Sequence, residues 1–352
     1  MNKFSTLPEE RPAIQIPLLL FFLCFQLLLS LPVQAAVSDP LIFSDEMLED
    51  ELIYPDWFKD HFGHLGDALN EARKAGKQGI IVYYGQKRCA YCRQFLLLDL
   101  GQPDIEKYIR DNFDVFPVDI WGIEDITDTD GTVYSERELA EHYKTTFTPS
   151  LVFYDLNGKT IFGLRGFYPP YKFKAALEYI VEGFYKKEKF RDYLLRADSA
   201  LVFSEGELTE RDFFASPPFN LDKARLLRRE TVLFFEQGNC HACNLLHSGP
   251  LNKTETVVEI EQMHAIQLDM TSDQPITFFD GKKTTAKQLA EKLGVFHVPT
   301  LIFFDPDGKE IIRIDSIVQF YRLQGVLDYV NRQGYTVEPD YQMWRLKQRK
   351  TE

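Results

Sequence analysis

Four of the five cysteines stand in two pairs of the form Cys-x-x-Cys, Cys89 with Cys92 and Cys240 with Cys243. The fifth, Cys24, lies in an apolar run near the N-terminus and is not expected to take part in chemistry. Disulfides that act as structural staples close long loops, where a cross-link stabilises most, whereas pairs two residues apart close almost nothing. The spacing therefore predicts thiol-disulfide chemistry at both pairs.

Each pair is expected to open a helix, which gives its two cysteines different tasks. The unpaired amide groups and the positive end of a helix favour a thiolate at the first position, so Cys89 and Cys240 are the predicted nucleophiles. Such a nucleophile forms a mixed disulfide with its substrate. Cys92 and Cys243, one helical turn further on, are then placed to resolve that intermediate.

Two other interpretations of the pairs stay open, a static structural disulfide and a metal site. A zinc ribbon separates its cysteine pairs by about 15–20 residues, whereas Cys240 lies 148 positions after Cys92. A metal site within one half would need further ligands, for which His241 and His247 are the near candidates. We expect no metal, and no cofactor other than the redox-active disulfides.

An internal repeat indicates how the chain is organised. The cysteine pairs lie 151 positions apart, each behind an apolar run, IIVYYGQKRC and TVLFFEQGNC. Further along the offset is 150, so that Asp119 matches Asp269 and Leu-Ala-Glu at 139–141 matches the same sequence at 289–291. These copies are much longer than the about 20–50 residues of a solenoid repeat. The repeat therefore predicts two duplicated domains.

Each copy is predicted to run strand, Cys-x-x-Cys turn, helix, strand, helix, strand. In the first copy the strands are expected at 80–84, 115–120 and 151–154, and the helices at 89–98 and 136–143. In the second copy the strands are expected at 231–235, 265–269 and 301–304, and the helices from 240 and at 285–293. Strands that alternate with helices indicate an α/β fold with a sheet covered on both faces.

The length of 352 residues and the 45% share of hydrophobic residues suit two globular domains. We predict a signal peptide or anchor at 1–36, domains at 37–198 and 222–338, a linker at 199–221 and a charged tail at 339–352. The linker is placed where Ser-Pro-Pro at 216–218 interrupts the periodicity.

The N-terminus has the features of a secretory signal. An apolar run at 13–31 follows Lys3 and Arg11 and leads into Val33-Gln34-Ala35, whose spacing of small residues suits signal peptidase. The run is also long enough to be retained as a membrane anchor. We therefore expect a periplasmic protein, secreted through its N-terminal signal. The formal net charge of −13 argues against nucleic acid as a partner.

The motifs around both pairs resemble those of the thioredoxin superfamily, specifically the exported thioredoxin-like proteins associated with bacterial sulfur oxidation (the SoxW-like group). The resemblance is carried by GQKRCAYC and ELAEHYKTTFTPSLVFYDLNG in the first copy. In the second copy it is carried by ETVLFFEQGNCHAC and KQLAEKLGVFHVPTLIFFDPDG. It covers nearly all of 55–190 and about 222–334, and it implies two tandem thioredoxin-like domains, each with three α/β/α layers and a mixed central sheet.

The resemblance also implies a substrate-binding loop beside each redox pair. In this family a cis proline follows the second helix and faces the cysteines, which transfers here to Pro149 and Pro299. Thr148 and Val298 precede these prolines. The loops are expected to present backbone groups to an extended segment of the substrate.

Departures from the family pattern leave the direction of electron flow open. Thioredoxins carry a buried acid in the strand before the motif, but this chain has Tyr83 and Phe234 at the matching positions. Proton transfer from the resolving cysteine would then need water or another group. Ala90-Tyr91 is closer to the Gly-Tyr of periplasmic disulfide isomerases than to the Gly-Pro of thioredoxin. Reductase, oxidase and isomerase all stay open.

Lys87, Arg88 and Arg93 flank the first pair, and on this basis we hypothesise that Cys89 has the lower thiol pKa of the two nucleophiles. The alternative is that these three side chains point to solvent and have little effect on the pKa of Cys89. His297, two residues before Pro299, is expected to be exposed and is left out of the predicted site.

The leading functional hypothesis is an extracytoplasmic thiol-disulfide oxidoreductase, specifically a reductase of exported protein disulfides. Its partners would be exported protein thiols and disulfides and a membrane thiol electron donor, because the compartment itself is oxidising. The alternative is a binding or adaptor protein whose thioredoxin folds recognise a partner while its cysteine pairs are inert. The physiological substrate, a relay of electrons between the domains, signal cleavage and the oligomeric state stay open.

Overall fold

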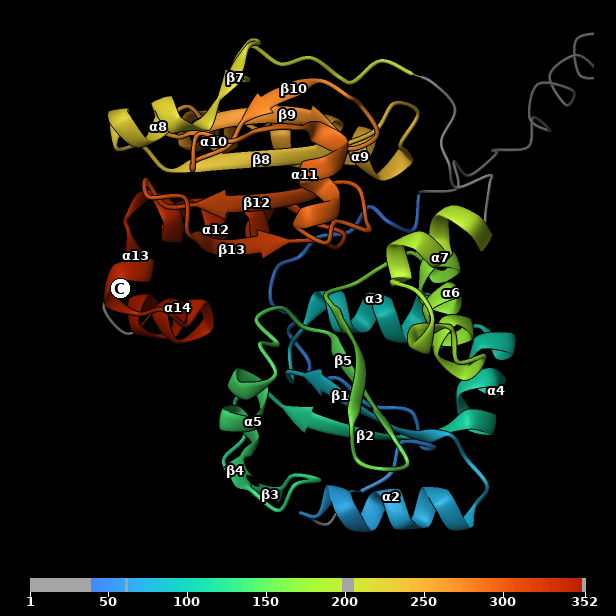
Figure 1. Ribbon diagram of the computed structural model, residues 1–352. Coiled ribbons are helices and arrows are strands. Elements are labelled where there is room, and N and C mark those ends of the chain that lie inside the picture. Colours follow the sequence, from blue (N-terminus) through green and yellow to red (C-terminus); the bar gives the residue numbers. More distant parts are fainter. Residues whose placement is uncertain (1–38, 61–62, 198–205, 350–352) are drawn as a thin grey trace, which may run out of the picture. The chain divides into compact units, whose positions relative to one another are not determined.

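A computed structural model describes residues 39–60, 63–197 and 206–349 (Figure 1). The predicted signal at 1–36 lies outside the described residues, as does part of the predicted linker. Within the described ranges, no helix is both long enough and apolar enough to cross a membrane. Two α/β domains follow one another along the chain, and each is built around its own four-stranded sheet.

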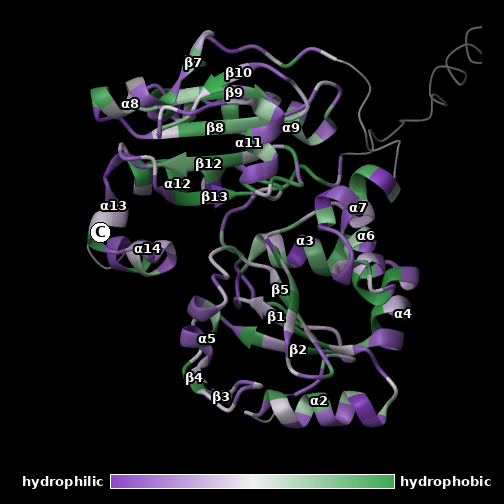
Figure 2. Ribbon diagram, in the orientation of Figure 1, coloured by the Kyte–Doolittle hydropathy of each residue, from purple (hydrophilic) through white to green (hydrophobic). Residues whose placement is uncertain are grey.

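The sheet of the first domain has the order β2-β1-β5-β6. Its strands are β1 (Gly79–Gly85), β2 (Phe113–Asp119), β5 (Ser150–Asp155) and β6 (Thr160–Arg165). β1 pairs in parallel with β2 and antiparallel with β5, which pairs antiparallel with β6. Every residue of β1 is buried, because helices cover both faces of the sheet. Figure 2 shows the arrangement of hydrophobic and hydrophilic residues along both domains.

Helices cover the two faces of this sheet. The helices of the first domain are α2 (Leu65–Lys74), α3 (Ala90–Leu98), α4 (Pro103–Asn112), α5 (Glu136–His142), α6 (Pro170–Val181) and α7 (Phe190–Ala197). One core joins Ile81 and Tyr83 to α3, α4, α6 and α7, and the other joins Ile80 and Val82 to α2 and α5. Alternate residues of β1 therefore serve opposite faces, which is the period of an extended strand. Pro103 and a Ser135–Glu138 capping box mark the starts of α4 and α5.

The second domain repeats this topology. Its sheet has the order β13-β12-β8-β9, with β8 (Thr231–Glu236), β9 (His264–Asp269), β12 (Thr300–Phe304) and β13 (Glu310–Ile314). Its helices are α8 (Leu221–Leu227), α9 (His241–Ser248), α10 (Thr254–Ile260), α11 (Ala286–Lys292), α12 (Phe320–Asn331), α13 (Gly334–Val337) and α14 (Tyr341–Arg349). β8 pairs in parallel with β9 and antiparallel with β12, as β1 does with β2 and β5.

Short strands and single turns connect these elements. β3 (Asp125–Thr127) pairs with β4 (Val133–Ser135), and β10 (Pro275–Thr277) pairs with β11 (Lys283–Thr285) and β7 (Phe219–Asn220). Within the described ranges, 3-10 turns lie at Phe184–Lys186 and Pro250–Asn252. Gly131 lies in the turn between β3 and β4, and its φ of +89° favours glycine.

The repeat extends into the segment predicted as a charged tail. Residues 339–352 contain α14, whose Tyr341 and Trp344 are buried against Tyr329 of α12. The matching helix of the first domain, α7, buries Phe190 and Tyr193 against Tyr179 of α6 in the same way. Lys347 and Arg349 of α14 are exposed, and the charged residues of this segment hid its apolar face in the sequence. The segment beyond the predicted boundary at 338 therefore contains a helix that packs on α12.

Asp99, directly after α3, supplies a test of stability against pH. Its carboxyl group is fully buried, neither oxygen has a hydrogen-bond partner, and burial raises its pKa well above the usual range. The folded protein then holds a proton that the unfolded chain loses near pH 4, so stability should fall as the pH rises above that value. Asp99→Asn should remove this fall and raise the free energy of unfolding at pH 7 by about 1–3 kcal/mol.

Urea unfolding between pH 4 and pH 8 measures this effect. Asp111→Asn, on the exposed side of α4, controls for the loss of one negative charge. Parallel stability curves for the parent and Asp99→Asn would show that the buried carboxyl costs nothing.

Candidate functional site

The first cysteine pair opens α3. Cys89 is the N-cap residue, and its Sγ accepts a hydrogen bond of 2.9 Å from the amide of Cys92. The two cysteines form a disulfide with an S–S distance of 2.19 Å and Cα atoms 5.1 Å apart. Cys89 is 5% exposed and Cys92 is fully buried. The predicted nucleophile is thus the more accessible sulfur and receives the helix N-terminal amide, which favours negative charge there.

A chain of hydrogen bonds leads to Cys89 from the proline loop. The hydroxyl of Thr148 lies 3.2 Å from Cys89 Sγ, and it must be the donor because a disulfide sulfur carries no hydrogen. Gln86 Nε2 donates to this hydroxyl at 2.9 Å, and Trp121 Nε1 donates to Gln86 Oε1 at 3.0 Å. The Thr148–Pro149 peptide bond is cis. The fold therefore brings together the first redox pair and the loop residues that the family resemblance indicated.

The second pair has the same backbone geometry. Cys240 is the N-cap of α9 and its Sγ accepts a 3.1 Å hydrogen bond from the amide of Cys243. The disulfide has an S–S distance of 2.13 Å and Cα atoms 5.2 Å apart. Cys240 Sγ lies 3.8 Å from the carbonyl oxygen of Val298, and the Val298–Pro299 bond is cis. The valine side chain has no hydroxyl group, so the second sulfur lacks the side-chain donor of the first.

A cavity of about 540 Å³ opens beside Cys89 and is lined by residues from both domains. Both domains lie in the single compact unit of residues 40–352. Arg322, at the start of α12, donates from Nη2 to the carbonyl of Thr148 at 2.9 Å and stacks on the ring of Tyr91, 3.3 Å from its centroid. The hydroxyl of Tyr91 accepts from the amide of Gln319 at 2.7 Å. A side chain of the second domain, Arg322, therefore already donates a hydrogen bond to the Thr148 carbonyl in the first proline loop.

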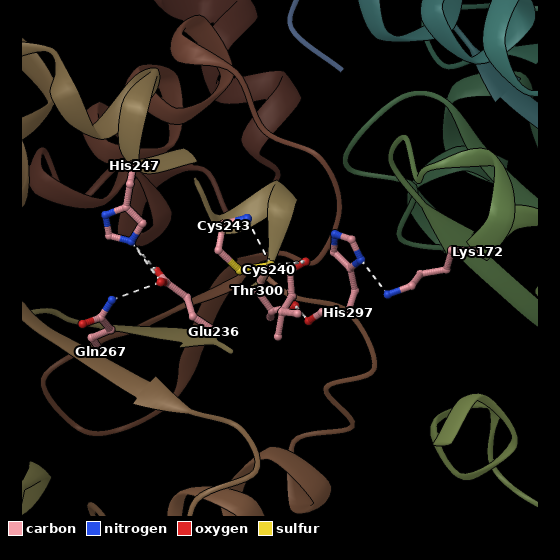
Figure 3. The surroundings of a disulfide bond; sticks show 9 residues. Lys172, Glu236, Cys240, Cys243, His247, Gln267, His297 and Thr300 are labelled. Atoms are coloured by element: carbon pink, nitrogen blue, oxygen red, sulfur yellow. Dashed lines mark hydrogen bonds and ion pairs between the residues drawn. A yellow bond between two sulfur atoms is a disulfide. The ribbon is translucent and has the colours of Figure 1, made fainter. Parts of the chain in front are cut away.

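The sequence expectation for His297 was wrong. His297 is 1% exposed, and its Nδ1 accepts from Nζ of Lys172 on α6 at 3.0 Å (Figure 3). Burial lowers the pKa of Lys172 to about 7, and burial together with Lys172 lowers the pKa of His297 well below its usual value. A histidine before a proline suggests an exposed loop, but here the first domain covers the loop.

Lys87, Arg88 and Arg93 are all exposed beside the first pair. Solvent weakens their effect on a thiolate, but the Thr148 hydroxyl adds a donor directly at the sulfur. We expect Cys89 in a Cys92→Ser chain to react with iodoacetamide several-fold faster at pH 6 than Cys240 in a Cys243→Ser chain.

The two loops supply a matched pair of variants for this comparison. Thr148→Val gives the first loop the residue of the second, and Val298→Thr does the reverse. The first should slow alkylation of Cys89 and the second should speed alkylation of Cys240. Equal or faster reaction of Cys240 in the parent chain would contradict the hypothesis.

A polar cluster on β8, α9 and β9 was not predicted from the sequence. Glu236 ends β8, and its carboxylate contacts His247 of α9 and Gln267 of β9 (Figure 3). An acid that ends an otherwise apolar strand, TVLFFE, was the available signal. His247, considered as a metal ligand, is thus engaged by a carboxylate. In the part of the chain that the structure describes, no group of three or more histidine, cysteine or acidic residues could hold a metal ion.

Comparison with known proteins places this geometry in a family. The thioredoxin-like domain family matches residues 65–181 and 220–331, together more than half of the chain. The chain therefore belongs to the thioredoxin-like domain family, and the predicted tandem arrangement is confirmed. With a disulfide-bonded Cys-x-x-Cys pair in each domain, it is a thiol-disulfide oxidoreductase. The narrower likeness to the sulfur-oxidation group stays a prediction.

Solved structures that resemble this chain span about one third of it. A thioredoxin-fold protein from Helicobacter pylori has 27% identity and a TM-score of 0.30, covering 36% of this chain and 83% of its own. A thioredoxin from Thermus thermophilus has 25% identity and a TM-score of 0.26, covering 33% and 82%. The reduced C-terminal domain of DsbD from Neisseria meningitidis has 17% identity and a TM-score of 0.25, covering 31% and 90%. No curated protein sequence matches this chain.

Proposed function

We propose that this protein is an extracytoplasmic reductase of protein disulfides that uses both cysteine pairs. The observation that carries the proposal is the duplicated geometry. In each domain the first cysteine caps a helix, and its sulfur lies 3.8 Å from the carbonyl of the residue before a cis proline. A sulfur held between a helix N-terminus and an extended loop is suited to attack a disulfide in a bound peptide segment.

The proposed reaction has two steps. The thiolate of Cys89 or Cys240 attacks one sulfur of the substrate disulfide, which forms a mixed disulfide and releases the other substrate sulfur as a thiolate. Cys92 or Cys243 then attacks the bonded cysteine, which closes the protein disulfide and releases the second substrate thiol. Two electrons pass from the protein dithiol to the substrate. A membrane thiol donor would return the pair to the dithiol state, because the exterior is oxidising.

Pro149 and Pro299, with Thr148 and Val298, are proposed to hold the substrate segment beside each pair. In the first domain the Thr148 carbonyl accepts from Arg322, so a substrate strand that pairs with this carbonyl has to displace the guanidinium or share the acceptor with it. The two pairs are therefore expected to accept the same kind of substrate with different affinities.

The reduction potential of each pair tests the direction of electron flow. Each pair is equilibrated in glutathione or dithiothreitol buffers, in a chain whose other pair is changed to serine. A value near the about −270 mV of thioredoxin supports a reductase, whereas a value near the about −120 mV of a strong periplasmic oxidant would make the protein a donor of disulfides. A pair that never exchanges would favour the adaptor role.

A further inference from the structure

Glu236 and His247 form a buried polar pair next to the second redox centre. Glu236 is 1% exposed and His247 is 2% exposed. His247 Nε2 lies 2.9 Å and 3.1 Å from the two carboxylate oxygens of Glu236, and Gln267 Nε2 donates to the same carboxylate at 3.0 Å. Burying a carboxylate costs free energy unless its lone pairs accept hydrogen bonds, and here His247 and Gln267 both contact the Glu236 carboxylate.

The hydrogen bonds define where the protons are. Arg211 donates from Nε to His247 Nδ1 at 3.4 Å and from Nη2 to the His247 carbonyl. Nδ1 is then an acceptor, so Nε2 carries the ring proton and donates to Glu236. Glu236 is assigned as a carboxylate that accepts from His247 and Gln267. Nδ1 of His247 faces the charged Arg211, and the carboxylate of Glu236 is the acceptor on which the hydrogen bonds of His247 and Gln267 converge.

Both elements that carry the pair also carry or lead into the second redox motif. His247 follows Cys243 by four positions on α9, and side chains at this spacing are neighbours on one face of a helix. Glu236 ends the strand that leads into the motif, on the face that also carries Phe234. In the view of Figure 3 the carboxylate lies on the side of His247 that faces the disulfide. Phe234 occupies the position of the thioredoxin acid, and Glu236 places a carboxylate two residues further on.

The first domain has no such pair. At the matching positions, 151 residues earlier, Gly85 ends β1 and Leu96 lies one turn after Cys92 on α3. The two centres thus share a backbone geometry but differ in the acid–base groups beside the resolving cysteine. Among the contacts of the described residues, the charged group that faces the pair is Arg211, and β9 contributes the neutral Gln267.

We infer that Glu236 is the proton acceptor for Cys243 in the second redox centre, and that His247 is the residue that positions it. The inference rests on the proposed function, because it concerns the resolving step of that exchange. Cys243 gives its thiol proton to the Glu236 carboxylate and its sulfur attacks Cys240 Sγ. The bond between the two cysteines forms, and the bond from Cys240 to the substrate breaks. The electron pair leaves on the substrate sulfur, which takes up the proton as a thiol.

Dithionitrobenzoate separates the two steps of the reaction. In a full chain carrying Cys24→Ser, Cys89→Ser and Cys92→Ser, attack by the reduced Cys240 releases a first equivalent of thionitrobenzoate. Attack by Cys243 on the resulting mixed disulfide releases the second. Stopped-flow absorbance follows both phases between pH 5 and pH 9, and Cys243→Ser identifies the first phase by itself.

Glu236→Gln, which keeps the shape of the side chain, should slow the second phase roughly 100-fold at pH 7 and leave the first phase within a few-fold. The loss should shrink toward pH 9, where the thiol ionises without assistance. His247→Gln should slow the second phase less and shift its pH profile. The same two substitutions in a chain with Cys240→Ser and Cys243→Ser should leave both phases of the first centre unchanged.

An unchanged second phase and pH profile in a folded Glu236→Gln variant would overturn the inference. Circular dichroism checks that each variant is folded. If Glu236→Gln does not fold, the second phase and its pH profile are measured in His247→Gln instead. A parent chain that releases neither equivalent would instead overturn the proposed function of this pair, so the two failures are distinguishable.

Discussion

Replacing Cys89 and Cys240 together by serine is expected to abolish disulfide reduction by this protein, with a loss of about 1,000-fold or more. Both residues cap helices that supply an amide to the sulfur, and a serine hydroxyl at the same place does not ionise near neutral pH. Each single variant should keep the activity of the other domain. The activity lost in each single variant therefore measures how much of the total disulfide reduction that cysteine pair contributes.

Matched variants of the resolving cysteines give the opposite signature. Cys92→Ser and Cys243→Ser should still attack a substrate but should accumulate it as a mixed disulfide, because the second step has lost its nucleophile. Non-reducing electrophoresis and mass spectrometry detect that adduct. Intact partner binding without any turnover in the parent would favour the adaptor role instead. Full activity in the double Cys89→Ser, Cys240→Ser chain would contradict the assignment of these two residues as the nucleophiles.

Trp344→Ala is expected to lower the free energy of unfolding of the second domain by about 3 kcal/mol or more. Trp344 is 6% exposed and packs on Tyr329, with ring centroids 5.2 Å apart. Truncation to alanine loses the apolar contacts of a large side chain and leaves a cavity between α14 and α12. Denaturant unfolding followed by far-ultraviolet circular dichroism measures the change. This signal comes from the backbone, so the loss of a tryptophan does not affect it.

Lys347→Ala is the control for this substitution, because Lys347 lies on the same helix and its side chain is 58% exposed. No measurable change is expected there, since exposed ion pairs contribute little. Equal effects of the two substitutions would mean that α14 does not pack on the second domain, and that residues 339–352 act as the charged tail that their composition suggests.

The two redox centres differ in what surrounds the same sulfur geometry. Thr148 gives the first sulfur a hydroxyl donor, whereas Val298 gives the second none. The second centre instead has a buried carboxylate at Glu236. A donor at the nucleophile and a base near the resolving cysteine act on different steps of one reaction. The duplicated domains are therefore expected to differ in which step limits them.

Much of the fold was predictable because its signals are local. The strands β1 and β8 are short apolar runs that end at a Cys-x-x-Cys turn, and their bounds differ from the predicted ones by one residue at most. The apolar runs persist because both faces of each sheet are covered. The repeat then gave the second domain from the first, as far as 338.

The repeat failed as a guide where the matching residues differ in type. α14 aligns with α7, but Arg345 stands where the first domain has Leu194. A charged sequence does not reveal that every third or fourth residue meets an apolar surface. The burial of Tyr341 and Trp344 depends on the presence of α12, which lies outside the segment itself.

The sequence by itself determined the two domains, the nucleophile and resolving cysteines as candidates, and the proline loops through their family motifs. These follow from spacing along the chain and from short patterns. Only the tertiary structure decided that Glu236 meets His247, that His297 is buried against Lys172, and that Arg322 bonds to the Thr148 carbonyl. The reason is physical, because the surroundings of a polar side chain are set by the residues that cover it, and those come from distant parts of the chain.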